Sequence, residues 1–146
     1  MLKSTAENLA QNVFTIEEFL ANEMTSNKID ISKFTSKSET VYYHGHCHQK
    51  ALSSNTHAET ILSIPLNFKV ETIDSGCCGM AGSFGYEKEH YELSQQIAED
   101  RLFPSLRGLE SAVLVSASGT SCRHQIRDGV NKTALHPIEV LYNALN

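Results

Sequence analysis

The chain lacks a long apolar run and a concentration of basic charge, and each absence excludes a class of function. No stretch of its 146 residues is long and apolar enough for a membrane span or for the apolar region of a signal peptide. We therefore expect a cytoplasmic protein, either free or peripheral to the inner face of the membrane. The 12 Lys and Arg residues are scattered and outnumbered by 17 Asp and Glu, giving a net charge of −5. This balance excludes a nucleic-acid surface, which needs clustered cations.

Cysteine is scarce, and the four that are present match no common short motif. There is no Cys-x2–4-Cys knuckle of the kind that supplies two ligands to structural zinc. A phosphatase loop, Cys-x5-Arg, is excluded because position 128 is Asp and Arg127 lies one residue too early. In a reducing compartment, cysteines serve as metal ligands or redox thiols more often than as disulfides. The alternative is four buried, inert thiols, but the adjacent Cys77-Cys78 within a run with glycine at 76, 79, 82 and 85 favours ligands.

The remaining pattern alternates strands and helices. Thr15-x-x-Glu18 is typical of a capping box that opens a helix, although apolar residues from Leu9 to Leu20 also fit one longer helix. Strands are predicted over 40–43, 68–73 and 112–115, and helices over 58–64, over 87–103 with a break at Pro104, from about 120, and from Pro137. We therefore expect an α/β fold with a mostly parallel sheet flanked by helices. Residues 1–39 would form a helical segment and linker, and 40–146 the α/β domain, within one compact unit.

Each cysteine follows one of the predicted strands. Cys47 comes after 40–43, Cys77 and Cys78 come after 68–73, and Cys122 comes after 112–115. The carboxyl ends of parallel strands lie at one edge of a sheet, where ligands of such folds collect. The cysteine loops are therefore predicted to meet in one crevice.

An iron–sulfur cluster suits thiolates that approach from separate loops, because each iron takes its own sulfur. Gly79 and Gly82 would let backbone N–H groups approach such a cluster. His44, His46 and His48 bracket Cys47 and can be direct ligands, hydrogen-bond donors to the ligands or surface residues. If the strand continued, alternation would put these three histidines on one side and Cys47 on the other. His136, before Pro137, is expected to cap a helix or pack in the core.

Three segments of the chain resemble the cysteine-rich CCG-domain family. The family includes one of the subunits of heterodisulfide reductase, iron–sulfur subunits of glycolate, glycerol-3-phosphate and lactate oxidation systems, and the carboxyl-terminal part of fused FAD-linked oxidases. The resemblance covers most of residues 40–145 and is carried by HGHCHQKAL at 44–52, CCGMAGSFG at 77–85 and SGTSC at 118–122.

The resemblance implies an electron-transfer domain of a D-2-hydroxyacid (lactate- or glycolate-type) oxidoreductase. Its implied partners are a flavin-containing dehydrogenase domain or subunit and a second, related CCG half-domain. FAD would belong to the parent protein only, and no catalytic residue is assigned to this chain. The implied cofactor is an iron–sulfur cluster of the [4Fe-4S] type, with Cys47, Cys77, Cys78, Cys122, Gly79 and Gly82 binding it and His46 and His48 as further metal ligands.

One position departs from the family pattern. The heterodisulfide reductase branch ends its motif with Cys-x-x-Cys, whereas Gly119 stands at the first of these positions. Four thiolates remain where that branch has five, which favours a four-cysteine or mixed Cys/His site. The alternatives are a structural or docking domain that binds zinc through three Cys with His46 or His48, and a thiol-redox enzyme that uses Cys77-Cys78.

Overall fold

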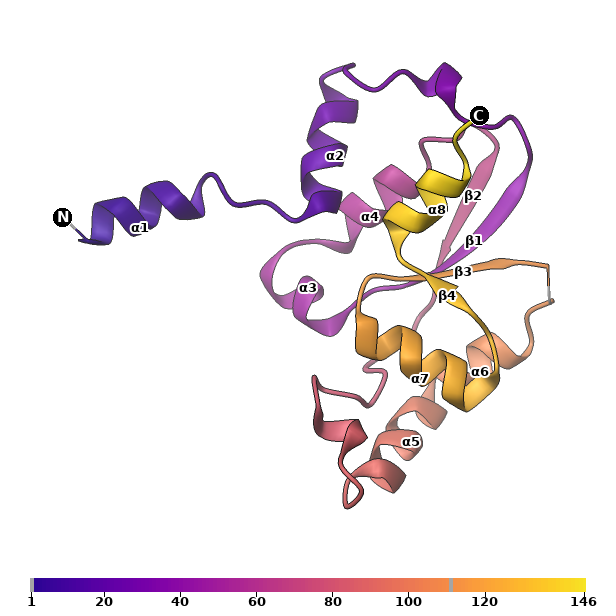
Figure 1. Cartoon of the computed structure of the whole chain (residues 1–146). Helices are drawn as coiled ribbons and strands as arrows, with labels where there is room; N and C mark the ends of the chain where they lie inside the picture. Colours follow the sequence, from indigo (N-terminus) through magenta and orange to yellow (C-terminus); the bar gives the residue numbers. More distant parts are fainter. Residues whose placement is uncertain (1, 111) are drawn as a thin grey trace.

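The computed structural model describes residues 2–110 and 112–146, which form a four-stranded sheet, eight α-helices and two 3-10 turns (Figure 1). The strands are β1 (Glu39–His44), β2 (Phe68–Thr72), β3 (Leu114–Ala117) and β4 (Ala134–Leu135). The first four helices are α1 (Leu2–Ala10), α2 (Ile16–Thr25), α3 (Cys47–Leu52) and α4 (Asn55–Leu62). They are followed by α5 (Tyr91–Asp100), α6 (Leu102–Arg107), α7 (Thr120–Val130) and α8 (Pro137–Asn143), and the 3-10 turns are η1 (Ile31–Lys33) and η2 (Phe84–Tyr86).

The sheet is parallel throughout, in the order β2-β1-β3-β4, which confirms the predicted fold class. Its two central strands pair with Tyr43 opposite Ser116 and His44 opposite Ala117. Successive side chains of a strand point to opposite faces, so His44 and Ala117 lie on one face while Tyr43 and Ser116 lie on the other.

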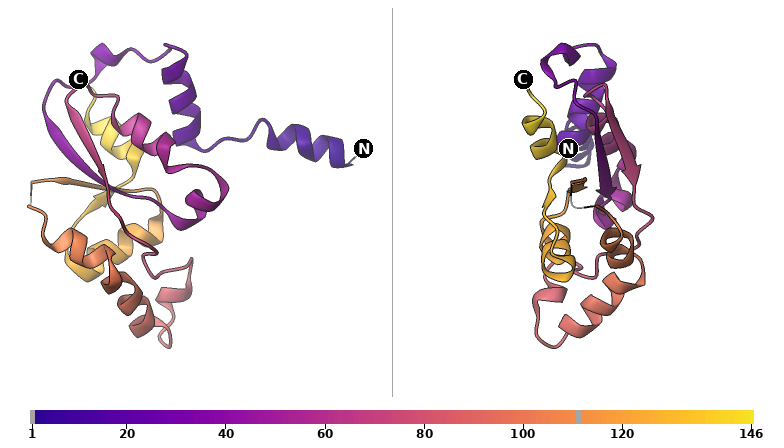
Figure 2. Two further views of the ribbon diagram at one scale, coloured as in Figure 1. Left: turned by 180° about the vertical axis from the view of Figure 1, so that it is seen from behind. Right: turned by 90° about the vertical axis from the view of Figure 1, so that its right-hand side faces the viewer.

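Helices cover both faces of the sheet, as a parallel sheet requires. One core packs Val41 and Tyr43 of β1 against α4 and α8, which lie above β3 and β4 in Figure 1. The other packs Val115 and Ala117 of β3 against α6 and α7, which lie below them. Figure 2 shows the same arrangement from behind and from the side. The second core also contains Cys78 and Cys122, which places these thiols on the α6/α7 side.

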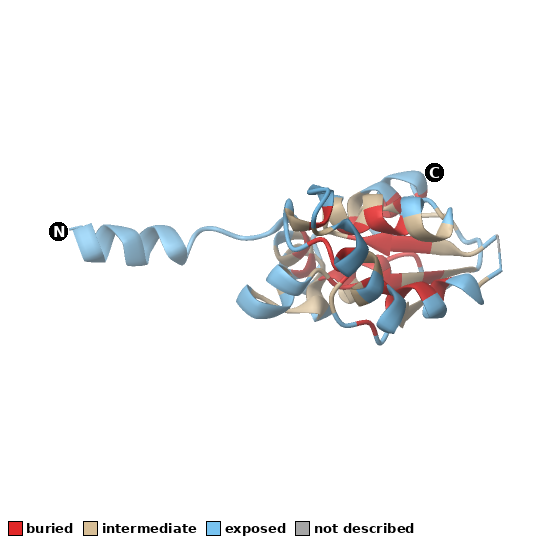
Figure 3. Ribbon diagram, turned by 90° about the horizontal axis from the view of Figure 1, so that it is seen from below, coloured by how far each residue is buried: buried red, intermediate tan, exposed pale blue. Residues whose placement is uncertain are grey.

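The N-terminal part contains an exposed helix and a packed one. Helix α1 has no buried residue and projects from the body, coloured as fully exposed in Figure 3. Helix α2 starts with the predicted capping box, in which Thr15 and Glu18 exchange hydrogen bonds. It packs on α4 through Ala21, which shares a small core with Ile61. The capping interaction therefore separates the two helices, and the alternative of one longer helix is wrong.

The helix predicted over 87–103 is the main difference in secondary structure. It begins at Tyr91 and breaks at Arg101, whose backbone leaves the helical region (φ −142°, ψ −44°). The position of the break agrees with the predicted effect of Pro104, because in a continuous helix the proline ring would clash with the carbonyl of Asp100, four residues earlier. Pro104 instead lies in the first turn of α6, where its missing N–H removes no intrahelical hydrogen bond. Helix α3 and the two-residue β4 were not predicted. No described helix is both long and apolar enough to cross a bilayer.

Candidate metal centre

Three strand ends deliver all four cysteines to one edge of the sheet, as predicted. Cys47 is the first residue of α3, and two residues separate it from the end of β1. Cys77 and Cys78 lie in the loop after β2, and Cys122 lies in the first turn of α7, after β3.

The most compact group in this crevice is His44, Cys78 and Cys122. One ligand atom from each lies within 4.8 Å of the others, and all three residues are buried. The Sγ atoms of Cys78 and Cys122 are 3.2 Å apart. Two sulfurs and an imidazole nitrogen, held together in the interior, form a donor set suited to a soft or borderline metal such as zinc or iron. The residues therefore fit a metal centre.

The contact between the two buried thiols shifts their pKa values in opposite directions. A hydrogen bond from the Cys122 thiol is the main cause that lowers the pKa of Cys78, assisted by hydrogen bonds from His44 and the N–H of Met80. The same contact with the Cys78 sulfur raises the pKa of Cys122, and burial raises it further. Negative charge is therefore favoured on Cys78 relative to Cys122.

The other two cysteines lie beside this group but are more accessible. Cys77 is half-buried, and its sulfur accepts a hydrogen bond of 3.3 Å from the N–H of Gly79. Burial raises the pKa of Cys77, the Gly79 N–H lowers it, and the nearby Cys78 and Cys47 thiols raise it further. Cys47 is exposed. The crevice therefore contains a buried pair of cysteines, Cys78 and Cys122, and a more accessible pair, Cys77 and Cys47.

Glycine is required at Gly79 because of its backbone and its neighbours. Its φ is +88°, and a Cβ there would lie 2.1 Å from the carbonyl oxygen of Ser94 on α5. The turn lets two successive amides, those of Gly79 and Met80, donate to the sulfurs of Cys77 and Cys78. Gly82 also has a positive φ, of 73°, but a Cβ there would meet open space.

The side chain of His46 lies next to Gly119. A Cβ on Gly119 would lie 2.4 Å from the Cδ2 atom of His46 and 2.9 Å from the sulfur of Cys122. His46 immediately precedes the first residue of α3 and is partly buried, which lowers its pKa. The imidazole thus stands beside Cys122 where a side chain at 119 would otherwise lie.

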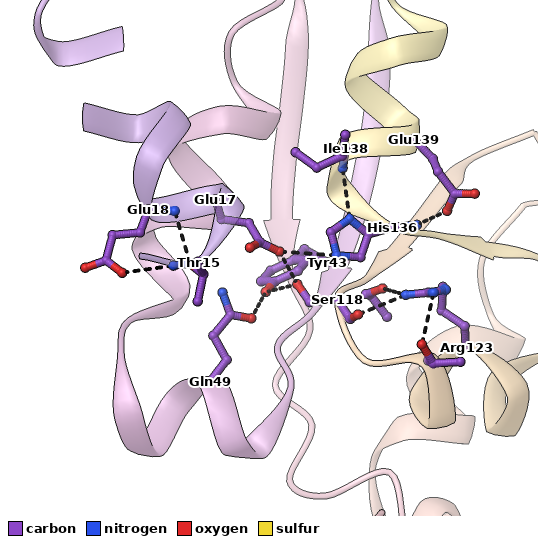
Figure 4. Close-up of polar contacts among 12 residues, drawn as sticks. Thr15, Glu17, Glu18, Tyr43, Gln49, Ser118, Arg123, His136, Ile138 and Glu139 are labelled. Atoms are coloured by element: carbon purple, nitrogen blue, oxygen red, sulfur yellow. Dashed lines mark hydrogen bonds and ion pairs between the residues drawn. The ribbon is translucent and has the colours of Figure 1, made fainter. Parts of the chain in front are cut away.

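A groove of about 590 Å³ opens beside the crevice. His48 is exposed and contacts His46 edge to face, with ring centroids 6.2 Å apart, and both line this groove. The lining also contains a buried carboxylate, that of Glu17, which accepts a hydrogen bond of 3.0 Å from Ser118 and lies 3.5 Å from Nε2 of His136. Figure 4 shows the side chains of Glu17, Ser118, His136 and Tyr43 pointing toward one another. Burial raises the pKa of Tyr43 to about 12, so the phenol stays protonated in this network.

Sequence reasoning missed His44 as a member of the compact group. The alternation argument treated His44, His46 and His48 as one set, but the strand ends at His44 and a helix begins at Cys47. His44 therefore points from the last strand position into the α6/α7 side, while His46 and His48 lie outside the compact group. Side chains two residues apart on a strand lie on the same face, so His44 shares a face with Tyr42, which packs against the core that contains Cys78 and Cys122. This alternation along the strand was the sequence signal that could have identified His44.

Comparison with known proteins identifies two kinds of relative. One of the subunits of the anaerobic glycerol-3-phosphate dehydrogenase of Escherichia coli K12 is 34% identical over 108 residues, which are 72% of this chain and 26% of that protein. The D-2-hydroxyglutarate dehydrogenase of the same strain is 29% identical over 131 residues, 89% of this chain and 12% of that protein. This chain is a distant relative of both.

A third relative, the D-2-hydroxyglutarate dehydrogenase of Pseudomonas putida, is 31% identical over 97 residues. The chain thus spans about a quarter or less of the length of these relatives. No protein-family model matches the chain. No solved structure matches it significantly. The chain is therefore related to dehydrogenases, and it carries a buried cysteine–histidine group that can hold a metal.

Proposed function

We propose that this chain is the electron-transfer domain of a dehydrogenase and that Cys47, Cys77, Cys78 and Cys122 hold an iron–sulfur cluster. The observation that carries the proposal is the convergence of a buried thiol pair with two further cysteines at the carboxyl edge of a parallel sheet. The resemblance to the CCG-domain family supports it, because the relatives include a dehydrogenase subunit and a dehydrogenase of 2-hydroxyacid type. When bound, the cluster would accept and donate one electron at a time.

The protein's own residues prepare this centre in two ways. The amides of Gly79 and Met80 donate to sulfurs and so stabilise negative charge on the thiolates. The gradient from buried Cys78 to exposed Cys47 places one side of the centre at the surface, where a partner could exchange electrons with it. We propose that this partner is a flavin-containing dehydrogenase domain or subunit that oxidises a 2-hydroxyacid or glycerol phosphate, and that a second cysteine-rich half-domain adjoins it.

The test is metal and sulfide analysis of anaerobically purified chain after reconstitution with Fe²⁺ and sulfide. We expect iron and acid-labile sulfide in equal amounts and a broad absorption band that bleaches on reduction. In a four-iron cluster each thiolate binds a different iron. Cys78 and Cys122, 3.2 Å apart without the cluster, must therefore move apart on assembly. Stoichiometric zinc without sulfide would contradict the proposal.

A structural zinc site is the second candidate, and one observation favours it. Zn–S bonds of about 2.3 Å in a tetrahedron place two sulfurs roughly 3.8 Å apart, close to the separation of Cys78 and Cys122. In this case a chelator should lower the melting temperature strongly, since structural zinc contributes about 10–16 kcal/mol in zinc-dependent peptides. Retention of the fold in a chelator, which the two large cores on the sheet favour, would exclude this role.

A further inference from the structure

His44 and Ser75 form a buried pair next to the sulfurs. His44 is 1% exposed and Ser75 is 5% exposed. The Nδ1 atom of His44 lies 2.5 Å from the Oγ atom of Ser75. One ring nitrogen of His44 lies within 4.8 Å of the sulfurs of Cys78 and Cys122. Because Nδ1 is engaged by Ser75, Nε2 is the nitrogen left to face these sulfurs. One side of the imidazole is therefore fixed by a hydroxyl while the other points at the metal-binding thiols.

Ser75 is itself held in place by its backbone. Its N–H donates to the carbonyl of Ile73 at 2.7 Å, and its carbonyl accepts from the Nζ atom of Lys50 at 3.1 Å. Ile73 in turn donates to the carbonyl of Tyr43 on β1. These contacts tie the loop that carries Cys77 and Cys78 to the end of the central strand. These backbone contacts fix the main chain from which the Ser75 hydroxyl projects toward His44.

A hydroxyl suits both states of the neighbouring imidazole, because it can donate and accept. Without metal, a Ser75 hydroxyl that donates to Nδ1 leaves the ring proton on Nε2, on the side of the sulfurs. With metal, the neutral ring takes its other tautomer, Nδ1–H donates to Ser75, and Ser75 turns its own proton toward the Ile73 carbonyl 3.5 Å away. The Nε2 lone pair is then free to bind a metal, and the histidine gains and loses no net proton.

From these contacts we infer that His44 is a direct metal ligand through Nε2, alongside Cys78 and Cys122, and that Ser75 is the residue that positions it. This inference rests on the proposed metal-binding function but differs from it in the ligand set. A metal-ligating histidine normally donates its other N–H to a fixed acceptor, which sets the tautomer and ring orientation. His46 and His48, by contrast, lie outside the compact group.

The first experiment measures the binding of Co²⁺ to the metal-free full chain, with sulfur-to-cobalt absorption as the readout. We expect His44→Gln and Ser75→Ala to weaken binding about 10–100-fold, as loss of such support does at other sites. Ser75→Thr keeps the hydroxyl and should restore binding. His57→Gln is the matched control, because His57 hydrogen-bonds Ser53 outside the compact group. Unchanged affinity in His44→Gln, with native circular dichroism, would overturn the inference.

The second experiment separates this inference from the proposed function. Chain labelled with nitrogen-15 histidine is reconstituted with iron and sulfide, reduced, and studied by pulsed electron paramagnetic resonance. We expect a strong nitrogen coupling typical of a bound imidazole, absent in His44→Gln and kept in His46→Gln. A cluster without this coupling, or a coupling lost only in His46→Gln, refutes the ligand role of His44 and leaves the electron-transfer proposal standing. If His44→Gln binds Co²⁺ weakly but the natural chain assembles no iron–sulfur cluster, the ligand role of His44 stands and the electron-transfer proposal fails.

Discussion

The sulfurs of Cys78 and Cys122 lie 3.2 Å apart although 43 residues separate them in the chain. Cys78 comes from the loop after β2, an edge strand, and Cys122 comes from the helix after β3, on the other side of β1. The central strand itself contributes His44 between them. The site is therefore a product of the strand order, and changes that move the β2 loop should affect metal binding before they affect the fold.

Replacing Cys78 with Ser should abolish metal assembly. The hydroxyl is a poor ligand for zinc and iron, and Cys78 belongs to the compact buried group with His44 and Cys122. Because the side chain keeps almost the same size, the core around Met80 and Ile126 should stay packed. Iron, zinc and sulfide analysis gives the first result and circular dichroism the second. A full complement of metal, or a spectrum of an unfolded chain, would contradict the expectation.

Replacing Gly79 with Ala should both destabilise the chain and weaken metal binding. The positive φ alone costs about 1–3 kcal/mol for a side-chain residue. The added Cβ would also meet the Ser94 carbonyl, which is backbone and cannot turn away. Gly76→Ala is the matched control, since a Cβ there meets nothing within 4 Å. Urea unfolding of both variants checks the difference, and equal midpoints would show that the turn is not constrained.

The stability of the metal-free chain should fall as the pH drops below about 6.5, in part through His136. Burial lowers its pKa, Arg123 lowers it further, and Glu17 and Glu139 raise it. The unfolded chain, with a His pKa of about 6.5, then binds more protons than the folded chain between the two pKa values. The contribution of His136 to stability is fully present above about pH 6.5 and is lost as the pH falls from there through the lowered pKa of the folded state.

The variant His136→Asn isolates this contribution. Asn can cap α8 as His136 does through its contact with the N–H of Ile138, but it does not titrate. Urea midpoints between about pH 5 and 8 should therefore depend less on pH in the variant than in the natural chain. Parallel curves would show that His136 carries none of the pH dependence.

Removing residues 1–12 should leave stability within about 0.5 kcal/mol of the full chain. Helix α1 buries no residue, so its deletion removes no part of the core. Thr15→Ala provides the contrast, because loss of the capping box typically costs about 1 kcal/mol. Thermal unfolding of the two variants makes the comparison. A truncated chain that melts well below Thr15→Ala would mean that α1 packs on the body in solution.

Much of the fold could be read from local sequence. The apolar run around Val115 and the alternation before Ile73 predicted parallel strands, and Thr15 and Pro137 marked helix starts correctly. Pro104 indicated that the helix predicted over 87–103 breaks, but not at which residue. A proline is compatible with any position in the first turn of the following helix, so it does not by itself locate the break at Arg101.

The sequence by itself determined that the thiols gather at one edge, because strands that all run the same way place their carboxyl ends together. Only the tertiary structure decided which side chains meet there. It ended β1 at His44, turned Cys47 outward on a new helix, and buried Cys78 against Cys122. Which atoms come within bonding distance depends on strand order, on the residue where each strand ends and on the packing of both faces. These are relations between distant segments that no local pattern contains.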